Sequence, residues 1–473
     1  MAELDRQTVV IVTLVLYQAL LIGIGIWASR RTHSEDDFFL GGRGLGPWVA
    51  AVSYSSSASS AWTLLGMSGL AYVVGVSAIW IVLGSIIGML VAWIWIAPRL
   101  MTFSRLHGYI TLTDLLLHDT AGGWRTAIKW SASLIVLVSF VFYIAAQFQG
   151  AGNTFASTFD LSMRNSIALG AAIIMVYTLL GGFWAVSVTD TVQGLLMAAT
   201  ALLLPIAAFI EVGGLQGFAA GLAAVSTPGQ LSFTAGNAGL VAVGVVLGGL
   251  SIGIGTYGQP HLLVRFMALR DASALRWGRW ITIFWYLIVF LGMCFLGLVG
   301  HVLHAGVDNP ETIFFVLTDS LFPTVLGAIL LAAVLSAIMS TADSQLLVAA
   351  SALSHDLGLG RHLPGGVMLV SRLTIVALVT AAVLVAIYLP EKIFSRVLFA
   401  WIALGSAFGP LLFARLLQVR VSSMAALASV LCGFTLAVVL YLAPDTPGSI
   451  AGRCLPFALA SVILWSGRRR LAP

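Results

Sequence analysis

The sequence predicts an all-α polytopic membrane protein, and properties of the whole chain lead to that fold class. Of the 473 residues, 60% are hydrophobic and only 9% are charged, a composition far from that of soluble globular domains. The mean hydropathy is +1.03, and apolar stretches long enough to cross a bilayer recur from end to end. The longest polar gaps are too short for a separate core. We therefore expect residues 1–473 to form a single transmembrane domain.

Apolar stretches of spanning length are separated by charged residues or by Gly and Pro, and they predict about thirteen transmembrane helices. The stretches run roughly 7–28, 45–72, 76–98, 125–150, 165–184, 188–212, 237–268, 276–303, 321–357, 366–389, 393–417, 423–443 and 450–467. The first begins after MAELDR and lacks a small-residue cleavage site, so it is a retained helix rather than a signal peptide.

The distribution of basic residues predicts the orientation of the chain. An odd number of spans puts the two termini on opposite sides of the membrane. With the N-terminus outside, 18 of the 23 Lys and Arg residues fall in inner loops, Arg265 among them. Because inner loops carry the excess of positive charge, we expect the N-terminus outside and the C-terminus in the cytoplasm.

Two of the stretches are interrupted in their middle. SYSSSASSAW (53–62) places six serines in an apolar span, and GGLSIGIGTYGQP (248–260) places five glycines and a proline in another. The two lie five helices apart and so cross in opposite directions, which is typical of two inverted five-helix repeats. We expect repeats at 45–212 and 237–417, with one extra helix at 7–28 and two further helices at 423–467. Close helix packing is the alternative explanation for the glycines.

A third polar element lies in AAVLSAIMSTADSQLLVAAS (332–351). Ala337, Ser340, Thr341 and Ser344 share one helix face, and neutral hydroxyl and carbonyl oxygens suit a hard cation such as Na⁺. Bonds from these hydroxyls to the preceding turn of their own helix are the alternative. Two ionisable side chains lie in spanning stretches: Asp343 in this one and Asp190 in the sixth stretch. Placing a carboxylate inside a membrane costs free energy, so the pair indicates a second cation site or a proton-binding pair. Helix capping is the alternative for Asp190.

Several longer motifs make the chain similar to the sodium:solute symporter family, and within it to bacterial sodium/proline symporters. These motifs are FFLGGRGLG (38–46), the Ser-rich interruption ending at Trp62, TLLGGFWAVSVTDTVQG (178–194), YGQPHLLVRFMA (257–268), AIMSTADSQLL (337–347) and AWIALGSAFGP (400–410). The resemblance extends over nearly the whole chain. It implies a LeuT-like fold with two inverted five-helix repeats, one helix before them and two after.

The resemblance also implies site residues. The principal sodium site would use the backbone carbonyls of Ser56, Ser59 and Ala337 with the hydroxyls of Ser340 and Thr341. A second cation site would stand at Asp190, Ser340, Asp343 and Ser344. The solute would be bound around Ser57, Trp62, Tyr143, Ile252, Thr256, Tyr257 and Pro260. Two positions depart from the proline symporters: Ala58 replaces an Asp, and Ile252 replaces a Trp.

These features predict a secondary transporter that couples Na⁺ to uptake of a small organic solute, with L-proline as the first candidate. The alternative substrate is another amino acid or a carboxylate such as pantothenate, moved with Na⁺ or H⁺. A passive channel and a transporter-like solute sensor are alternatives of another class. We expect no enzymatic activity, no organic cofactor, no nucleic acid and no obligate protein partner. The site of action would be the bacterial plasma membrane. The chain has three cysteines, and their spacing is not that of a metal site. We expect them to be reduced and to serve helix packing: Cys294, Cys432 and Cys454.

Overall fold

The structure is a computed structural model that describes residues 6–29, 39–179, 182–362, 366–389, 391–443 and 451–468. Within these ranges it is helical, with two isolated β-bridges and no β-strand. Some residues used above lie outside the described ones: Phe38, Leu180 and Gly181 of the family motifs, and Arg30, Arg31, Arg469 and Arg470 of the inner arginines.

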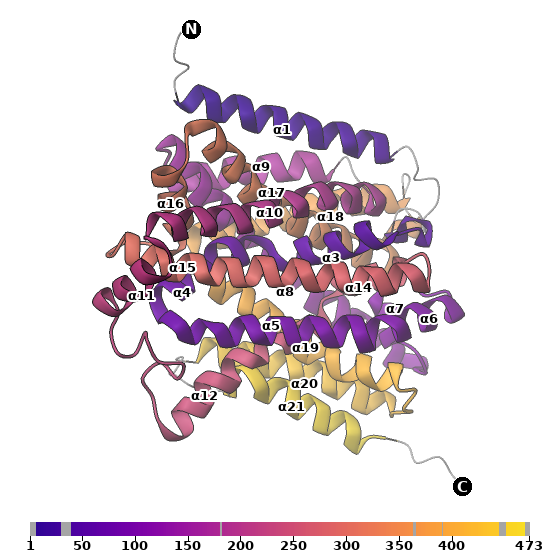
Figure 1. The fold of residues 1–473 in the computed structure, drawn as a ribbon. Helices are drawn as coiled ribbons and strands as arrows, with labels where there is room; N and C mark the ends of the chain where they lie inside the picture. Colours follow the sequence, from indigo (N-terminus) through magenta and orange to yellow (C-terminus); the bar gives the residue numbers. More distant parts are fainter. Residues whose placement is uncertain are drawn as a thin grey trace.

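The long helices run side by side, and the chain enters and leaves the bundle at opposite ends: α1 begins at the left of Figure 1 and α21 ends at the right. The α-helices are α1 Arg6–Ser29, α3 Pro47–Ala61, α4 Ser68–Val74, α5 Ile79–Val91, α6 Ala97–His107, α7 Leu112–Leu116, α8 Gly122–Phe159, α9 Met163–Thr178, α10 Phe183–Glu211, α11 Gly214–Val225, α12 Gly239–Leu250, α13 Pro260–Ala268, α14 Ala272–Tyr286, α15 Gly292–Leu303, α16 Ile313–Leu321, α17 Thr324–Ser351, α18 Gly366–Tyr388, α19 Ile393–Leu416, α20 Ser423–Leu442 and α21 Ala451–Ser466. Shorter 3₁₀ or π segments are η1 Gly41–Arg43, η2 Trp62–Met67, η3 Gly75–Ala78, η4 Ala92–Ile96, η5 Ser251–Gly258, η6 Leu287–Leu291, η7 Pro310–Thr312, η8 Ala352–Asp356 and η9 Leu359–His362.

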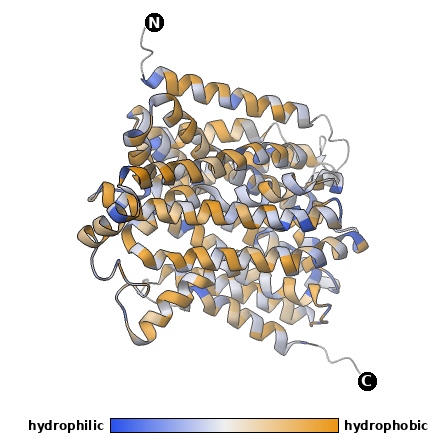
Figure 2. Ribbon diagram, viewed as in Figure 1, coloured by the Kyte–Doolittle hydropathy of each residue, from blue (hydrophilic) through white to orange (hydrophobic). Residues whose placement is uncertain are grey.

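Apolar residues dominate the length of the helices, whereas hydrophilic residues gather toward the two ends of the bundle (Figure 2). Among the described residues, ten helical segments are long and apolar enough to cross a membrane. The all-α polytopic fold class is therefore confirmed, while the number of thirteen crossings stays a prediction. The predicted extra helix, α1, lies along α10 and α17, where the Tyr17 and Ser336 hydroxyls form a hydrogen bond.

Both predicted interruptions are present. In α3 the backbone leaves the helical region at Ser60, whose φ is 49° and ψ is −170°, and the wider turns of η2 follow directly. In the second span, α12 ends at Leu250, the 3₁₀ segment η5 runs to Gly258, and Gln259 is extended before α13 begins. Two spans thus lose their regular hydrogen-bonding ladder part-way through, so their backbone groups need other partners.

The glycines of η5 also serve close packing, because backbone lies directly on backbone on both sides of this segment. A Cβ on Gly88 of α5 would stand 2.6 Å from the Cα of Gly253, and one on Gly253 would stand 2.4 Å from the carbonyl oxygen of Gly84. On the α19 side, a Cβ on Gly258 would stand 2.0 Å from the carbonyl oxygen of Leu404. We call these contacts, with Gly255 and Gly405, the glycine seam. Interruption and close packing are therefore both properties of η5.

We expect Gly88→Ala to destabilise the protein by about 1–3 kcal/mol, because a methyl group has no room against the Gly253 backbone. The matched control is Gly23→Ala in α1, where nothing lies within 4 Å of an added Cβ. It should be neutral, or stabilising by up to about 1 kcal/mol. Thermal unfolding of both variants in detergent measures the difference, and equal melting temperatures would contradict the packing argument.

Candidate functional site

Two hydrogen bonds join α3 to α17, and a third lies within α17 beside them. The Thr341 hydroxyl donates to the Ser57 carbonyl at 3.0 Å, and the Ser57 hydroxyl donates to the Ser340 carbonyl at 3.0 Å. The Ser340 hydroxyl donates to the Ala337 carbonyl at 3.2 Å. Ser56 and Ser59 flank Ser57 on α3, and all of these residues are fully buried. Ser57, Ser340 and Thr341 thus meet at an interface lined by neutral oxygen atoms, a ligand type that suits Na⁺. The Ser56 hydroxyl donates instead to the Asp190 carbonyl of α10, and the Ser59 carbonyl accepts from Thr63.

A buried arginine organises the polar groups beside this interface. Arg265 of α13 is 1% exposed, and its Nη2 forms an ion pair with Asp190 of α10 at 2.7 Å. The same guanidinium donates to the hydroxyls of Ser53 (2.7 Å), Ser57 (2.8 Å) and Ser344 (2.7 Å). Four helices, α3, α10, α13 and α17, therefore meet at one side chain. We call Ser53, Ser57, Asp190, Arg265 and Ser344 the arginine cluster.

The assignment of Arg265 to an inner loop is wrong. The short helix α13 carries it into the bundle, and Asp190 provides the opposite charge that makes burial of a guanidinium tolerable. Ser53 supports this pair by donating its own hydroxyl to Asp190 at 2.7 Å. Asp190 is accordingly an ion-pair partner in the core rather than the cap of a helix.

The residues predicted for a second cation site do not all come together. Asp190 and Ser344 meet at Arg265, whereas Asp343 of α17 accepts a hydrogen bond from Thr178 of α9. The other Asp343 carboxylate oxygen has no hydrogen-bond partner among the described residues. The position between Asp190 and Ser344 thus already holds a positive group of the protein itself.

Two of the predicted solute residues belong to an aromatic cluster next to the interruption of α3. The Trp62 indole donates to the Ala58 carbonyl at 3.0 Å, and its ring centroid lies 5.9 Å from that of Trp401. Trp401 in turn donates to the Tyr143 hydroxyl at 3.0 Å. Phe290 and Phe394 pack edge-on or tilted against Trp62 at 5.4 and 6.1 Å. Trp401 and these two phenylalanines were not among the predicted solute residues.

The other predicted solute residues lie on neighbouring segments. Ile252 and Thr256 are buried in η5, at 4% and 2% exposure, and Tyr257 packs against Phe413 of α19 at 5.3 Å. Ser57 belongs to the arginine cluster. Pro260 lines a cavity together with Phe39, Thr111, Arg265, Ser344 and Ser351. This cavity lies between the arginine cluster and the start of α7.

Gln147 is a functional candidate that the sequence analysis missed. Its side-chain oxygen accepts from the Ala61 amide at 3.1 Å, and its side-chain nitrogen donates to the Ser60 hydroxyl at 3.3 Å. Gln147 is fully buried in α8 and so satisfies backbone and side chain at the point where α3 breaks. The two glutamines in the otherwise apolar run YIAAQFQG (143–150) are the signal that would have identified it.

We expect Gln147→Leu to lower stability by about 1–3 kcal/mol, because the buried Ala61 amide loses its acceptor. Gln147→Glu keeps an acceptor of the same length for that amide, but it removes the donor to Ser60 and buries a carboxyl group, so it should lower stability as well. Melting temperature and solute uptake of the two variants, measured side by side, check both losses. A Gln147→Leu protein as stable and as active as the wild type would exclude the capping role.

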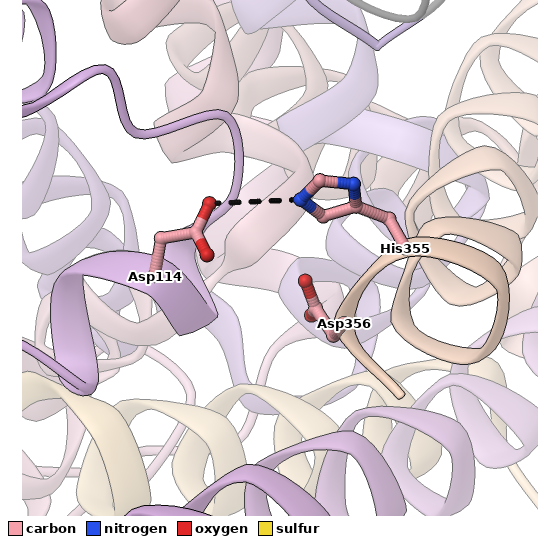
Figure 3. Close-up of side chains that lie close together, drawn as sticks. All are labelled: Asp114, His355 and Asp356. Carbon is pink, nitrogen blue, oxygen red and sulfur yellow. Dashed lines mark ion pairs between the residues drawn. The ribbon is translucent and has the colours of Figure 1, made fainter. Parts of the chain in front are cut away.

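A cluster of titratable side chains joins α7 to η8, the segment that follows α17 (Figure 3). Ligand atoms of Asp114, His355 and Asp356 all lie within 4.8 Å of one another, and His355 Nε2 is 3.9 Å from Asp114. Thr111 donates its hydroxyl to Asp356 at 2.8 Å. Burial acts to raise the pKa of Asp114, but bonds from His355 and from the amides of Thr111 and Ile110 outweigh it and hold that pKa below its ordinary value. One imidazole and two carboxylates form a donor set that transition metals accept, although both carboxylates already accept hydrogen bonds from α7 and the residues before it.

Comparisons with known proteins agree with this architecture. A family model described as the sodium:solute symporter family matches residues 38–433. The osmoregulated proline transporter OpuE of Bacillus subtilis is 35% identical over 437 residues, covering 90% of this chain and 87% of the relative. The high-affinity proline transporter PutP of the same organism is 34% identical, covering 87% of each. A solved Na⁺-coupled sialic acid symporter, in a substrate-bound outward-open state, superposes with a TM-score of 0.79 at 18% identity, covering 99% of this chain and 100% of the symporter.

The chain belongs to the sodium:solute symporter family. Its family and its relatives are transporters, Na⁺ is the coupling ion of the family, and the chain is a multi-pass membrane protein. The structural likeness to the sialic acid symporter confirms the predicted LeuT-like fold.

Proposed function

We propose that this protein is a symporter that uses the Na⁺ gradient to move a small organic solute into the cell, with L-proline as the first substrate to test. The observation that carries the coupling is the α3–α17 interface, where buried neutral oxygens gather beside the interruption of α3. The choice of L-proline rests on the names of the relatives, which are proline transporters.

In this proposal Na⁺ is bound by the carbonyls of Ser56, Ser59 and Ala337 and by the hydroxyls of Ser340 and Thr341. One Na⁺ accompanies each solute, because the Arg265 guanidinium takes the place of a second cation between Asp190 and Ser344. Asp343 remains a candidate proton site, since one of its oxygens lacks a partner among the described residues.

The solute is proposed to bind next to the aromatic cluster, with Trp62 and Tyr143 as its aromatic wall and Ser57, Ile252, Thr256, Tyr257 and Pro260 on the adjoining segments. Ala58 and Ile252 add neither a carboxylate nor a further indole to the Trp62 and Trp401 rings, which leaves room for a solute other than proline. A carboxylate such as pantothenate is the second candidate, because the amide groups of interrupted helices accept carboxylates. The repeats at 45–212 and 237–417, the external N-terminus and the cytoplasmic C-terminus belong to the same proposal.

The test is uptake of radiolabelled L-proline into proteoliposomes that contain the purified protein, with an inward Na⁺ gradient or with choline in its place. A membrane potential of 100 mV should drive about 50-fold accumulation for each positive charge moved, since this corresponds to about 2.3 kcal/mol. We expect uptake only with Na⁺, and a Hill coefficient near one for Na⁺. Uptake driven by a pH gradient without Na⁺ would favour H⁺ coupling through Asp343. Solute binding without any accumulation would favour a sensor.

A further inference from the structure

The side chains of His355 and Asp356 in η8 face Asp114 of α7 (Figure 3), and their ligand atoms all lie within 4.8 Å of one another. The segment η8 is π-helical, a wider turn that is frequent at functional sites, and here it directs two consecutive side chains toward the same partner. We call Asp114, His355 and Asp356 the α7–η8 triad. An ion at about 2.1 Å from each ligand keeps the ligand atoms at most about 4.2 Å apart, so a side-chain shift of about half an ångström closes the set around it.

The α7–η8 triad contains two carboxylates and one imidazole. Among the described residues, the only ion pair of Asp114 is with His355, and Asp356 forms none. Two arginines at this end of the bundle, Arg125 and Arg415, donate instead to carbonyls at the end of α7, at 3.1 and 3.4 Å. Two carboxylates at this separation repel each other unless a proton or a cation lies between them. A divalent cation bound with a neutral imidazole balances both carboxylates.

The hydrogen bonds of the two carboxylates hold the ligands in place without using all of their acceptor positions. The Thr111 hydroxyl donates to Asp356 Oδ1 at 2.8 Å. The amides of Ile110 and Thr111 donate to Asp114 Oδ2 at 3.0 and 3.1 Å. A carboxylate offers about four lone-pair positions on its two oxygens, so each of these side chains can still bind an ion. Carboxylates that bind metals are ordinarily oriented by hydrogen bonds of this kind.

The α7–η8 triad lies beside the cavity that the arginine cluster lines. Thr111 lines this cavity and also donates to Asp356. Phe39 lines it too, and its ring centroid lies 5.9 Å from that of His355. In the proposed fold α7 belongs to the repeat at 45–212 and η8 to the repeat at 237–417. An ion held by the triad therefore connects the two repeats next to this cavity.

We propose that the α7–η8 triad is a binding site for a divalent transition-metal ion such as Zn²⁺, with one imidazole and two carboxylates as protein ligands and water in the remaining position. Imidazole together with carboxylate suits transition ions, whereas Mg²⁺ and Ca²⁺ take oxygen ligands. The bound ion ties α7 to η8 and opposes the separation of the two repeats at this end of the bundle. That consequence rests on the proposed function, but the binding of the ion does not.

Metal binding is measured on the purified full-length protein, free of any polyhistidine tag and stripped of metal with EDTA. Equilibrium dialysis against Zn²⁺ should find one bound ion per chain that an excess of Mg²⁺ or Ca²⁺ does not displace. His355→Gln and Asp356→Asn should each weaken this binding more than about tenfold, and Zn²⁺ should raise the melting temperature of the wild type but not that of His355→Gln. The matched control is His118→Gln. His118 lies 3.6 Å from Asp119, but no third ligand joins this pair among the described residues, so Zn²⁺ binding should stay as in the wild type.

Uptake into proteoliposomes tests the connection between the repeats, with Zn²⁺ present on both faces at a concentration that saturates the site. We expect slower solute uptake by the wild type, recovery after EDTA, and no response to Zn²⁺ in His355→Gln. A wild-type protein without a stoichiometric Zn²⁺ ion, or binding that His355→Gln and Asp356→Asn both leave unchanged, would overturn the metal site. Zn²⁺ that binds without slowing uptake would overturn the connection between the repeats. If L-proline is not transported while Zn²⁺ still binds and stabilises the protein, the proposed substrate fails and the metal site stands.

Discussion

The Arg265→Met substitution should abolish Na⁺-dependent uptake and lower stability by about 3–5 kcal/mol, because it leaves the Asp190 carboxylate buried without its partner. Asp190 is fully buried, and Ser53 and Ser57 cannot supply a positive charge. The three serine hydroxyls that now accept from the guanidinium lose a donor at the same time. Thermal unfolding in detergent and uptake into proteoliposomes measure the two effects.

Two controls distinguish the ion pair from general damage. The double variant Asp190→Asn with Arg265→Met removes both charges and should recover much of the lost stability without recovering transport. Arg270→Met removes an exposed arginine that pairs with Asp271 just beyond α13, and it should change stability by less than about 1 kcal/mol. A single Arg265→Met variant that melts at the wild-type temperature would show that the charge is not required in the core.

The Thr341→Ala substitution should raise the Na⁺ concentration for half-maximal uptake about tenfold, which corresponds to about 1.4 kcal/mol of binding free energy. In the proposed sodium site Thr341 supplies one of two hydroxyl ligands, and it also holds α17 to the Ser57 carbonyl. At saturating Na⁺ the maximal rate should stay close to that of the wild type, because the solute wall is untouched. Initial uptake rates over a range of Na⁺ concentrations measure the shift.

Thr341→Ser is the matched control, since it keeps the hydroxyl and should leave the Na⁺ dependence within about twofold of the wild type. Ser85→Ala removes a buried hydroxyl that bonds only within its own helix α5, and no effect on Na⁺ is expected. An unchanged Na⁺ dependence in Thr341→Ala would remove Thr341 from the sodium site.

Hydropathy and breaks in helical pattern were enough to predict much of this fold. The runs of apolar residues located the helices, and the serines of 53–62 and the glycines of 248–260 marked the two interruptions that the structure shows. The sequence could not specify the exact position of the first break, since Ser60, which has the positive φ, is one of six serines, and the Gln147 side chain that donates to it comes from another span.

The arginine cluster escaped the sequence analysis for a different reason. A charge at the end of an apolar stretch is usually a loop residue, but Arg265 is buried because α13, which continues the interrupted span after η5, lies inside the bundle. Its partner Asp190 lies 75 residues away, so nothing local pairs the two. The hydrogen bond from Trp401 to Tyr143, which joins α19 to α8, is likewise a pairing between distant parts of the chain. Pairings across spans depend on packing that no local pattern contains.

The glycine seam distinguishes positions where only glycine fits from positions where the side chain can differ. Where backbone lies on backbone, as at Gly88, Gly253 and Gly258, no other residue has room for its side chain. Ala58 of α3 and Ile252 of η5, by contrast, are buried positions that carry side chains, so a change of residue there alters the side chain rather than a contact between backbones. A few side-chain changes can therefore alter the substrate specificity of this fold, while the backbone contacts of the glycine seam stay the same.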